Sequence, residues 1–230
     1  MQNLDKQHLS IVVNEVLLEA DLMLPLNASA IIIIGNIPGN KCMNHQNKVV
    51  AHHLVTRGFG TLQIDLLTPE EVRLTDYQFD INLLAFRLVR STERLEDMME
   101  KAYPLGYFAS GRVATAALSA ATALQQVKAI VSISGASELA RDSLSELQAA
   151  TLLLVESLDL KGVAINQEAF SLLKGQKSLQ VIQGTACMFD DKTTSDQLCT
   201  LTGDWFEDNL KPVKLFDTLY SIALSENNES

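Results

Sequence analysis

The chain has 230 residues, of which 47% are hydrophobic and 20% are charged, with 18 basic against 28 acidic residues and a formal net charge of -10. This length and apolar content predict one domain with a substantial core, spanning residues 1–230. The acidic balance argues against a nucleic-acid partner or an anionic membrane surface, because binding to phosphates needs lysine and arginine side chains.

The cysteines and the N-terminus indicate a cytoplasmic protein. The three cysteines lie far apart and form no C-x-x-C pair, which favours reduced thiols. The first ten residues are polar and lack the apolar region of a secretory signal. The most apolar short run, residues 30–35, is far too short to cross a bilayer.

Strand and helix patterns alternate along the chain. Two extended segments, at 9–16 and 17–25, predict an antiparallel hairpin at the edge of a sheet. Further strands are predicted at 30–35, 60–67, 104–109, 127–134, 150–157 and 178–184. Helices are predicted at 47–58, 79–102, 113–124 and 166–175, with a last helix opening on a capping box of Thr194 and Gln197. The polar tail at 224–230 is predicted to fray.

This alternation predicts an α/β fold, in which a mostly parallel sheet lies between two layers of helices. Ligands bind such sheets at the carboxyl ends of the strands. Functional residues are therefore expected just after each strand, at 35–41, 65–71, 109–113, 134–136, 156–159 and 184–190.

Several segments carry a family resemblance that covers essentially the whole chain. They include DLMLP, GFGTLQIDLLTPEE, FDINLLAFRLV, LGYFAS, KAIVSISG, TLLLVESLD and GTACMFDD with DWFEDNL, in that order. In these segments the chain resembles the dienelactone-hydrolase-like group of the α/β-hydrolase superfamily. The resemblance implies a three-layer sandwich and a catalytic triad of nucleophile, acid and histidine in that chain order.

The resemblance places the nucleophile position on a glycine. The family holds its nucleophile on a strained strand-to-helix elbow, G-x-S-x-G. Aligned on the GYF segment, the elbow covers residues 109–113 and its tip is Gly111, which offers no nucleophile. Ser110 lies one residue earlier and would serve as an alternative nucleophile if the turn slipped by one residue. Otherwise Ser110 is a turn or helix-capping serine.

The other two triad positions fall on Asp159 and Cys187. Asp159 keeps an acid after its strand, although a residue there can also cap a loop. Cys187 stands where the histidine should be, and a thiol with a pKa near 8.5 cannot relay protons as imidazole does. The four histidines all precede residue 54. The resemblance therefore implies a degenerate triad.

The loop after residue 34 lacks the His-Gly pair common in the family, but it retains Gly35 and Asn36, which we expect in the cleft. Arg112 is the most unusual residue of the elbow. We expect it to fill the mouth of the former active site and to pair with Asp159, Asp190 or Asp191. No metal site or cofactor is predicted, because the acidic residues at 65, 70 and 71 lack a histidine partner.

The leading functional interpretation is a protein that has lost hydrolase activity and binds a small ligand or a protein partner through the old cleft or its rim. One alternative is an active hydrolase of esters or related acyl compounds that uses Ser110 or Cys187. Another is a structural subunit whose surface matters more than its cleft. Self-association into a homo-oligomer is compatible with each interpretation.

Overall fold

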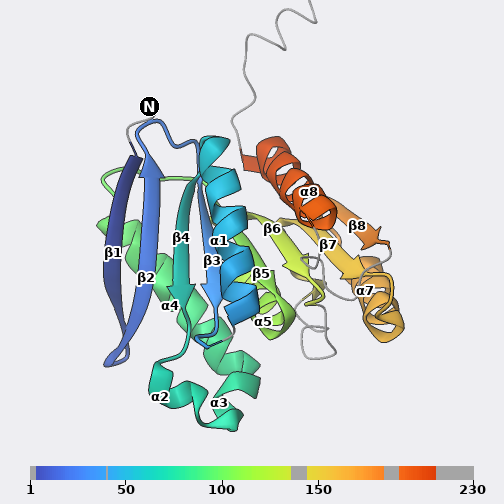
Figure 1. Ribbon diagram of the computed structural model, residues 1–230, viewed down its shortest axis with the longest axis horizontal. Helices are drawn as coiled ribbons and strands as arrows, with labels where there is room; N and C mark the ends of the chain where they lie inside the picture. The colour runs from blue at the N-terminus through green and yellow to red at the C-terminus, as the bar shows by residue number, and fades with distance from the viewer. Residues whose placement is uncertain (1–3, 40, 136–143, 184–191, 211–230) are drawn as a thin grey trace, which may run out of the picture.

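An eight-stranded sheet runs through the protein (Figure 1), in the order β1-β2-β4-β3-β5-β6-β7-β8. The computed structural model describes residues 4–39, 41–135, 144–183 and 192–210. β1 and β2 pair antiparallel, β2 and β4 also pair antiparallel, and the remaining pairs are parallel. The strands are β1 (Leu4–Val13), β2 (Val16–Pro25), β3 (Ile31–Asn36), β4 (Gly60–Asp65), β5 (Leu105–Ser110), β6 (Val127–Ile133), β7 (Ala150–Glu156) and β8 (Lys177–Ile182). The predicted α/β fold with an antiparallel hairpin at its edge is confirmed.

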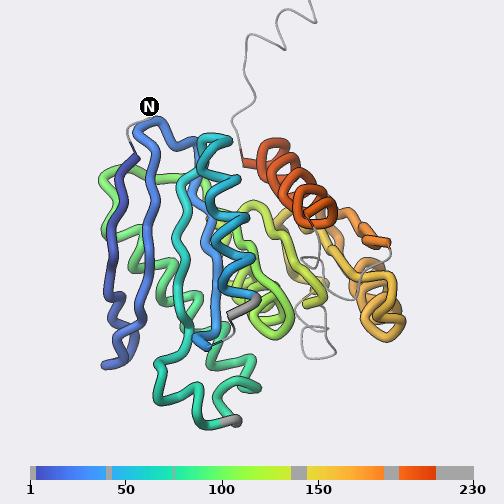
Figure 2. The backbone as a smooth tube through the Cα atoms, viewed as in Figure 1, coloured from blue at the N-terminus to red at the C-terminus, as the bar shows by residue number. Residues whose placement is uncertain are grey.

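Helices cover both faces of this sheet (Figures 1 and 2). One buried apolar cluster joins the sheet to α4, α5 and α7, and a second joins its other face to α1 and α8. None of the described helices is both long and apolar enough to cross a bilayer. The helices are α1 (Lys41–Thr56), α2 (Pro69–Val72), α3 (Thr75–Phe79), α4 (Ile81–Met98), α5 (Gly111–Ala123), α7 (Leu160–Leu172) and α8 (Lys192–Leu210).

Several predicted helix boundaries are wrong. The long helix predicted at 79–102 is α4, but α4 is shorter and runs from Ile81 to Met98. Phe79 ends the separate helix α3, and the Asp80 side chain caps the start of α4 by accepting a hydrogen bond from the Leu83 amide at 2.9 Å. α1 and α7 begin at residues 41 and 160, ahead of the predicted 47 and 166. α8 begins at Lys192, so Thr194 lies inside its first turn and does not cap it.

The central strand β3 brings α5 close to the sheet. Every residue of β3 is buried, as expected for a parallel strand covered on both faces. A Cβ at Gly35 would come within 2.6 Å of Val113 Cγ1. Glycine at this position therefore lets the first turn of α5 pack directly against the end of β3.

A nearly buried ion pair anchors the segment that follows β4. Thr68 and Glu71 form a capping box at the start of α2. Arg87 of α4 donates to both carboxylate oxygens of Glu71, at 2.6 and 2.7 Å, and also to the Leu66 carbonyl at 2.9 Å. The bonds from Arg87 lower the pKa of Glu71 below its ordinary value. The pair thus fixes the position of α2 relative to α4. It also restricts the position of α3, which lies between them in the chain.

We predict that Glu71→Gln destabilises the fold by about 3 kcal/mol at neutral pH, because it leaves the Arg87 charge buried without its partner. Since the pKa of Glu71 is lowered from 4.5, this contribution is fully present above that pH and is lost as the pH falls through the lowered pKa. Urea unfolding of both proteins from pH 7 to pH 3 measures the difference. Glu93→Gln, which breaks the exposed pair with Arg90, should change stability by no more than about 0.5 kcal/mol. Equal effects of the two substitutions would contradict the prediction.

Candidate functional site

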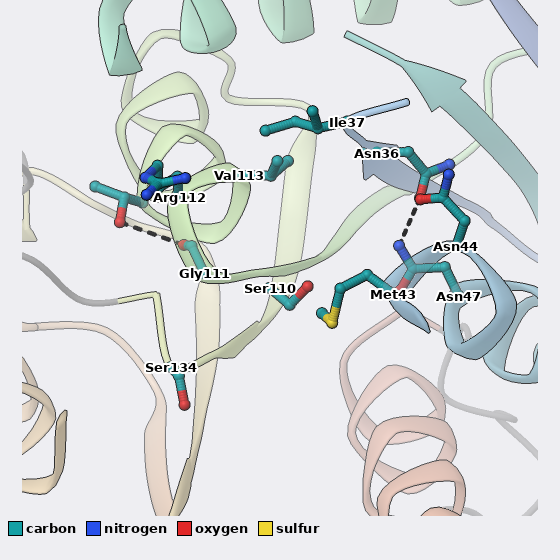
Figure 3. A pocket seen from close by; sticks show the side chains of 12 residues that line it. Asn36, Ile37, Met43, Asn44, Asn47, Ser110, Gly111, Arg112, Val113 and Ser134 are labelled. Carbon is teal, nitrogen blue, oxygen red and sulfur yellow. Dashed lines mark hydrogen bonds between the residues drawn. The ribbon is translucent and has the colours of Figure 1, made fainter. Parts of the chain in front are cut away.

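A pocket of about 470 Å³ opens at the carboxyl ends of β3 and β5. This is the edge at which a parallel sheet binds its ligands. Figure 3 shows its side chains converging from the loop after β3, from α1 and from the turn between β5 and α5. Its described lining residues are Gly35, Asn36, Ile37, Met43, Asn44, Asn47, Ser110, Gly111, Arg112, Val113, Thr115 and Ser134.

Gly111 occupies the tip of the turn from β5 into α5. Its φ is +55°, in the left-handed region that side chains other than glycine adopt at a cost. A Cβ built on Gly111 would meet no atom within 4 Å. A side chain at this position would therefore have open space at the edge of the pocket.

Ser110 is the last residue of β5 and has extended backbone angles, with φ -132° and ψ 152°. It occupies the N-cap position of α5, but its side chain makes no capping hydrogen bond. The hydroxyl is half-buried and in Figure 3 it is turned away from Arg112. Within the described part of the chain, no imidazole or carboxylate lies within hydrogen-bonding distance of it.

Asp159 lies away from the pocket. It is exposed and caps α7, where its side chain accepts a hydrogen bond from the Gly162 amide at 2.9 Å. The structure therefore does not bring Asp159 together with Gly111 or Ser110. Cys187, the predicted histidine position, lies outside the described residues.

Arg112 contacts an aromatic ring. Its guanidinium carbon lies 3.6 Å from the centre of the Phe79 ring, close enough for a cation–π interaction. The expected pairing with Asp159 is wrong, because that carboxylate is engaged at α7. Asp190 and Asp191 lie outside the described residues. Arg112 is the one charged side chain among the pocket residues described above.

An amide cluster forms the wall opposite Arg112, and only Asn36 of this cluster was predicted from the sequence. The Asn47 amide donates to Asn36 Oδ1 at 2.5 Å. The buried Oδ1 atoms of Asn44 and Asn47 have no donor among the described residues. The i, i+3 spacing of Asn44 and Asn47 just after the glycine-rich loop is the sequence signal for this wall. Such a wall suits a ligand with hydroxyl or amide groups.

A second missed feature joins the ends of β6 and β7. Ser134 has a φ of +48°, an uncommon conformation for a residue other than glycine. Its hydroxyl donates a short hydrogen bond to Glu156 Oε2. Glu156 itself does not line the pocket, and no hydrogen bond joins this pair to Ser110.

The histidines do not contribute to the pocket. His45 and His52 are exposed on α1. His53 is half-buried, and burial lowers its pKa. Among residues 4–39, 41–135, 144–183 and 192–210, no three His, Cys, Asp or Glu side chains form a cluster that could hold a metal ion.

We predict that Gly111→Ser folds but loses about 1–2 kcal/mol of stability, because serine must adopt a positive φ there. It should gain no measurable ester hydrolysis, since no base stands beside the new hydroxyl in the described pocket. Chemical denaturation and a fluorogenic-ester assay measure the two effects.

Gly58→Ser is the matched control for Gly111→Ser. Gly58 also has a positive φ, of +84°, and open space around its missing Cβ, but it does not line the pocket. It should lose a similar amount of stability. Turnover of the ester by Gly111→Ser and not by Gly58→Ser would show that a working base is present.

Comparisons with known proteins support the fold. No family model matches the chain. The crystal structure of a dienelactone hydrolase from Anabaena variabilis is 33% identical, with a TM-score of 0.84, over 90% of this chain and 99% of that one. A zinc-bound, cold-adapted esterase from an Arctic intertidal metagenomic library is 16% identical, with a TM-score of 0.72, over 90% of this chain and 95% of that one. The second likeness concerns the fold alone.

Two curated relatives come from two strains of Mycobacterium tuberculosis and carry the provisional name phosphoribosyl transferase. Each is 36% identical over 206 residues, which is 89% of this chain but 46% of the relative. The chain thus spans less than half the length of these relatives.

Proposed function

This chain belongs to the dienelactone hydrolase family of the α/β-hydrolase fold, and we propose that within this family it has lost hydrolytic activity and binds a small anionic metabolite in its pocket. One observation carries the proposal: a glycine, Gly111, sits at the left-handed tip of the turn where the family places its nucleophile. The chemistry of the described lining agrees with it. That lining contains no histidine, cysteine, aspartate or glutamate that could act as nucleophile or base.

Two features of the pocket favour an anionic group on the ligand. The first N–H groups of α5 have no partners within the helix, and Ser110 does not cap them. They lie at the positive end of a helix of 13 residues. Arg112 adds a full positive charge beside them. Stacking on Phe79 covers one face of its guanidinium, which leaves the N–H edge for a carboxylate or phosphate.

Arg112→Ala should weaken binding of such an anion about tenfold, because a charge-assisted hydrogen bond contributes about 1.5–3 kcal/mol. A thermal-shift panel of small carboxylates and phosphate esters, followed by titration of any that stabilise the protein, measures the effect. Arg90→Ala is the control, since Arg90 also lies over an aromatic ring, that of Phe86, but away from this pocket. Equal losses in the two variants would mean that the attraction is not specific to the site.

The rival function is an active hydrolase that uses Ser110 or Cys187. Ser110 is extended and one residue short of the turn tip, which disfavours it. A fluorophosphonate probe and iodoacetamide should label neither residue faster than an unfolded control, and short acyl esters and thioesters should not turn over. Labelling that disappears in Ser110→Ala or Cys187→Ala, together with ester turnover, would overturn the proposal.

The name of the mycobacterial relatives does not transfer to this chain. More than half of each relative has no counterpart here, so phosphoribosyl transfer cannot be assigned to the shared segment. A structural or partner-binding role is the remaining alternative. A partner that co-purifies with the protein, together with no thermal shift from any anion, would favour that role over a metabolite-binding pocket.

A further inference from the structure

A second, smaller pocket of about 150 Å³ adjoins the first at the β1-β2-β4 edge of the sheet. Asn36 and Asn44 line both pockets. The remaining walls of the second pocket come from β1, β2, β4 and α1, and they are formed mainly by charged and amide side chains. Nothing in the proposed function uses this pocket.

Strand pairing gathers these side chains on one face of the sheet. His8 of β1 is in register with Asp21 of β2, and Asp21 is in register with Gln63 of β4. Residues directly opposite one another on paired strands share a face, as do residues two positions apart on one strand. Asp65, two residues after Gln63, therefore joins the same face, where it is in register with Asn36 of β3.

Two groups that line this pocket have no hydrogen-bond partner among the residues that the structure describes. The Gln63 side chain is 8% exposed and makes no hydrogen bond within the described chain. An amide with so little solvent contact and no partner among the described residues would gain hydrogen bonds from a ligand that enters the pocket. Asp65 is half-buried and also accepts no hydrogen bond from a described residue. Burial, with Asp21 and Glu19 nearby, raises its pKa.

The charges around the pocket are predominantly negative. Glu19 and Asp21 are bridged by His8, which lies 2.8 Å from a carboxylate oxygen of each. Lys48 of α1 lines the pocket, but it forms no ion pair within 4.0 Å of Asp65. Within the described segments, Asp65 is thus a carboxylate with no cation in contact, and Asp21 and Glu19 lie near it.

We propose that this second pocket binds a small organic cation that carries a primary ammonium group, with Asp65 and Gln63 as its principal acceptors. An ammonium has three donors and no acceptor, which matches a carboxylate and an amide oxygen that both lack donors. It would also offset the repulsion that Asp21 and Glu19 exert on Asp65. A metal ion fits less well, because the described carboxylates and His8 do not form a metal-binding cluster.

The test is titration of the whole protein with 1,4-diaminobutane at physiological ionic strength, by calorimetry and by thermal shift. The neutral isostere 1,4-butanediol serves as the ligand control. The diamine should raise the melting temperature in a concentration-dependent way, and the diol should not. Asp65→Asn should weaken diamine binding about tenfold or more, as expected for a lost charge-assisted hydrogen bond.

Asp208→Asn is the matched variant, because Asp208 is an exposed carboxylate of α8 that does not line this pocket. It removes the same charge and should change diamine affinity less than twofold. Asp65→Asn should fold at least as stably as the unsubstituted protein, since it removes a half-buried charge. Gln63→Leu, measured in parallel, should also weaken binding.

Three results would overturn the proposal: no diamine binding, equal weakening by Asp65→Asn and Asp208→Asn, or an equal shift with the diol. Displacement of the diamine by millimolar Mg²⁺ that itself stabilises the protein would also overturn it, in favour of a metal site. The proposed anion site is tested independently of this pocket. Arg112→Ala should weaken anion binding and leave diamine binding unchanged.

Discussion

The backbone turns from β5 into α5 through a single left-handed residue, Gly111, and the walls of the main pocket take their positions from this turn. The turn directs Arg112 toward Phe79. It also seats Val113 against Gly35, where a Cβ would come within 2.6 Å of the valine. A less sharp turn would carry α5 away from β3, and the pocket between them would not have its present walls. The residue at the tip of this strained turn is thus a glycine, which presents no side chain to the pocket.

The placement of Phe79 depends on a second constraint, which lies farther from the pocket. The bidentate pair of Arg87 with Glu71 joins α4 to α2, and α3, which ends at Phe79, lies between them in the chain. An ion pair with little solvent exposure holds its geometry well, because both charges would lose their main compensation if it opened. The position of the ring that supports Arg112 is therefore set by residues that do not touch a ligand.

The two pockets differ in charge although they share Asn36 and Asn44. The main pocket has amides and one described cation, at the positive end of a helix. The second has Glu19, Asp21 and Asp65 against Lys48 and His8. The shared asparagines are neutral and can both donate and accept hydrogen bonds, so they suit a ligand in either pocket. The two proposals thus place ligands of opposite charge in adjoining pockets of one sheet.

Local sequence patterns determined the order of the strands and helices, the buried character of β3 and the position of glycine at the turn tip, because these follow from hydrophobic periodicity and backbone conformation along a short segment. The α/β class and the edge hairpin were predicted on that basis. Helix starts were predicted less well, since a start such as that of α4 depends on a local hydrogen bond, here from the Leu83 amide to Asp80, that periodicity does not report.

Contacts between distant segments were decided only by the tertiary structure. Arg112 was predicted to pair with a carboxylate, but α3 brings Phe79 to it, and Asp159 is engaged in capping α7. The amide wall and the unpartnered Gln63 and Asp65 also arise from helix and strand packing across the sheet. Sequence spacing fixes which side chains share a face of one strand or helix. Which side chains from different elements come into contact depends on how those elements pack in three dimensions.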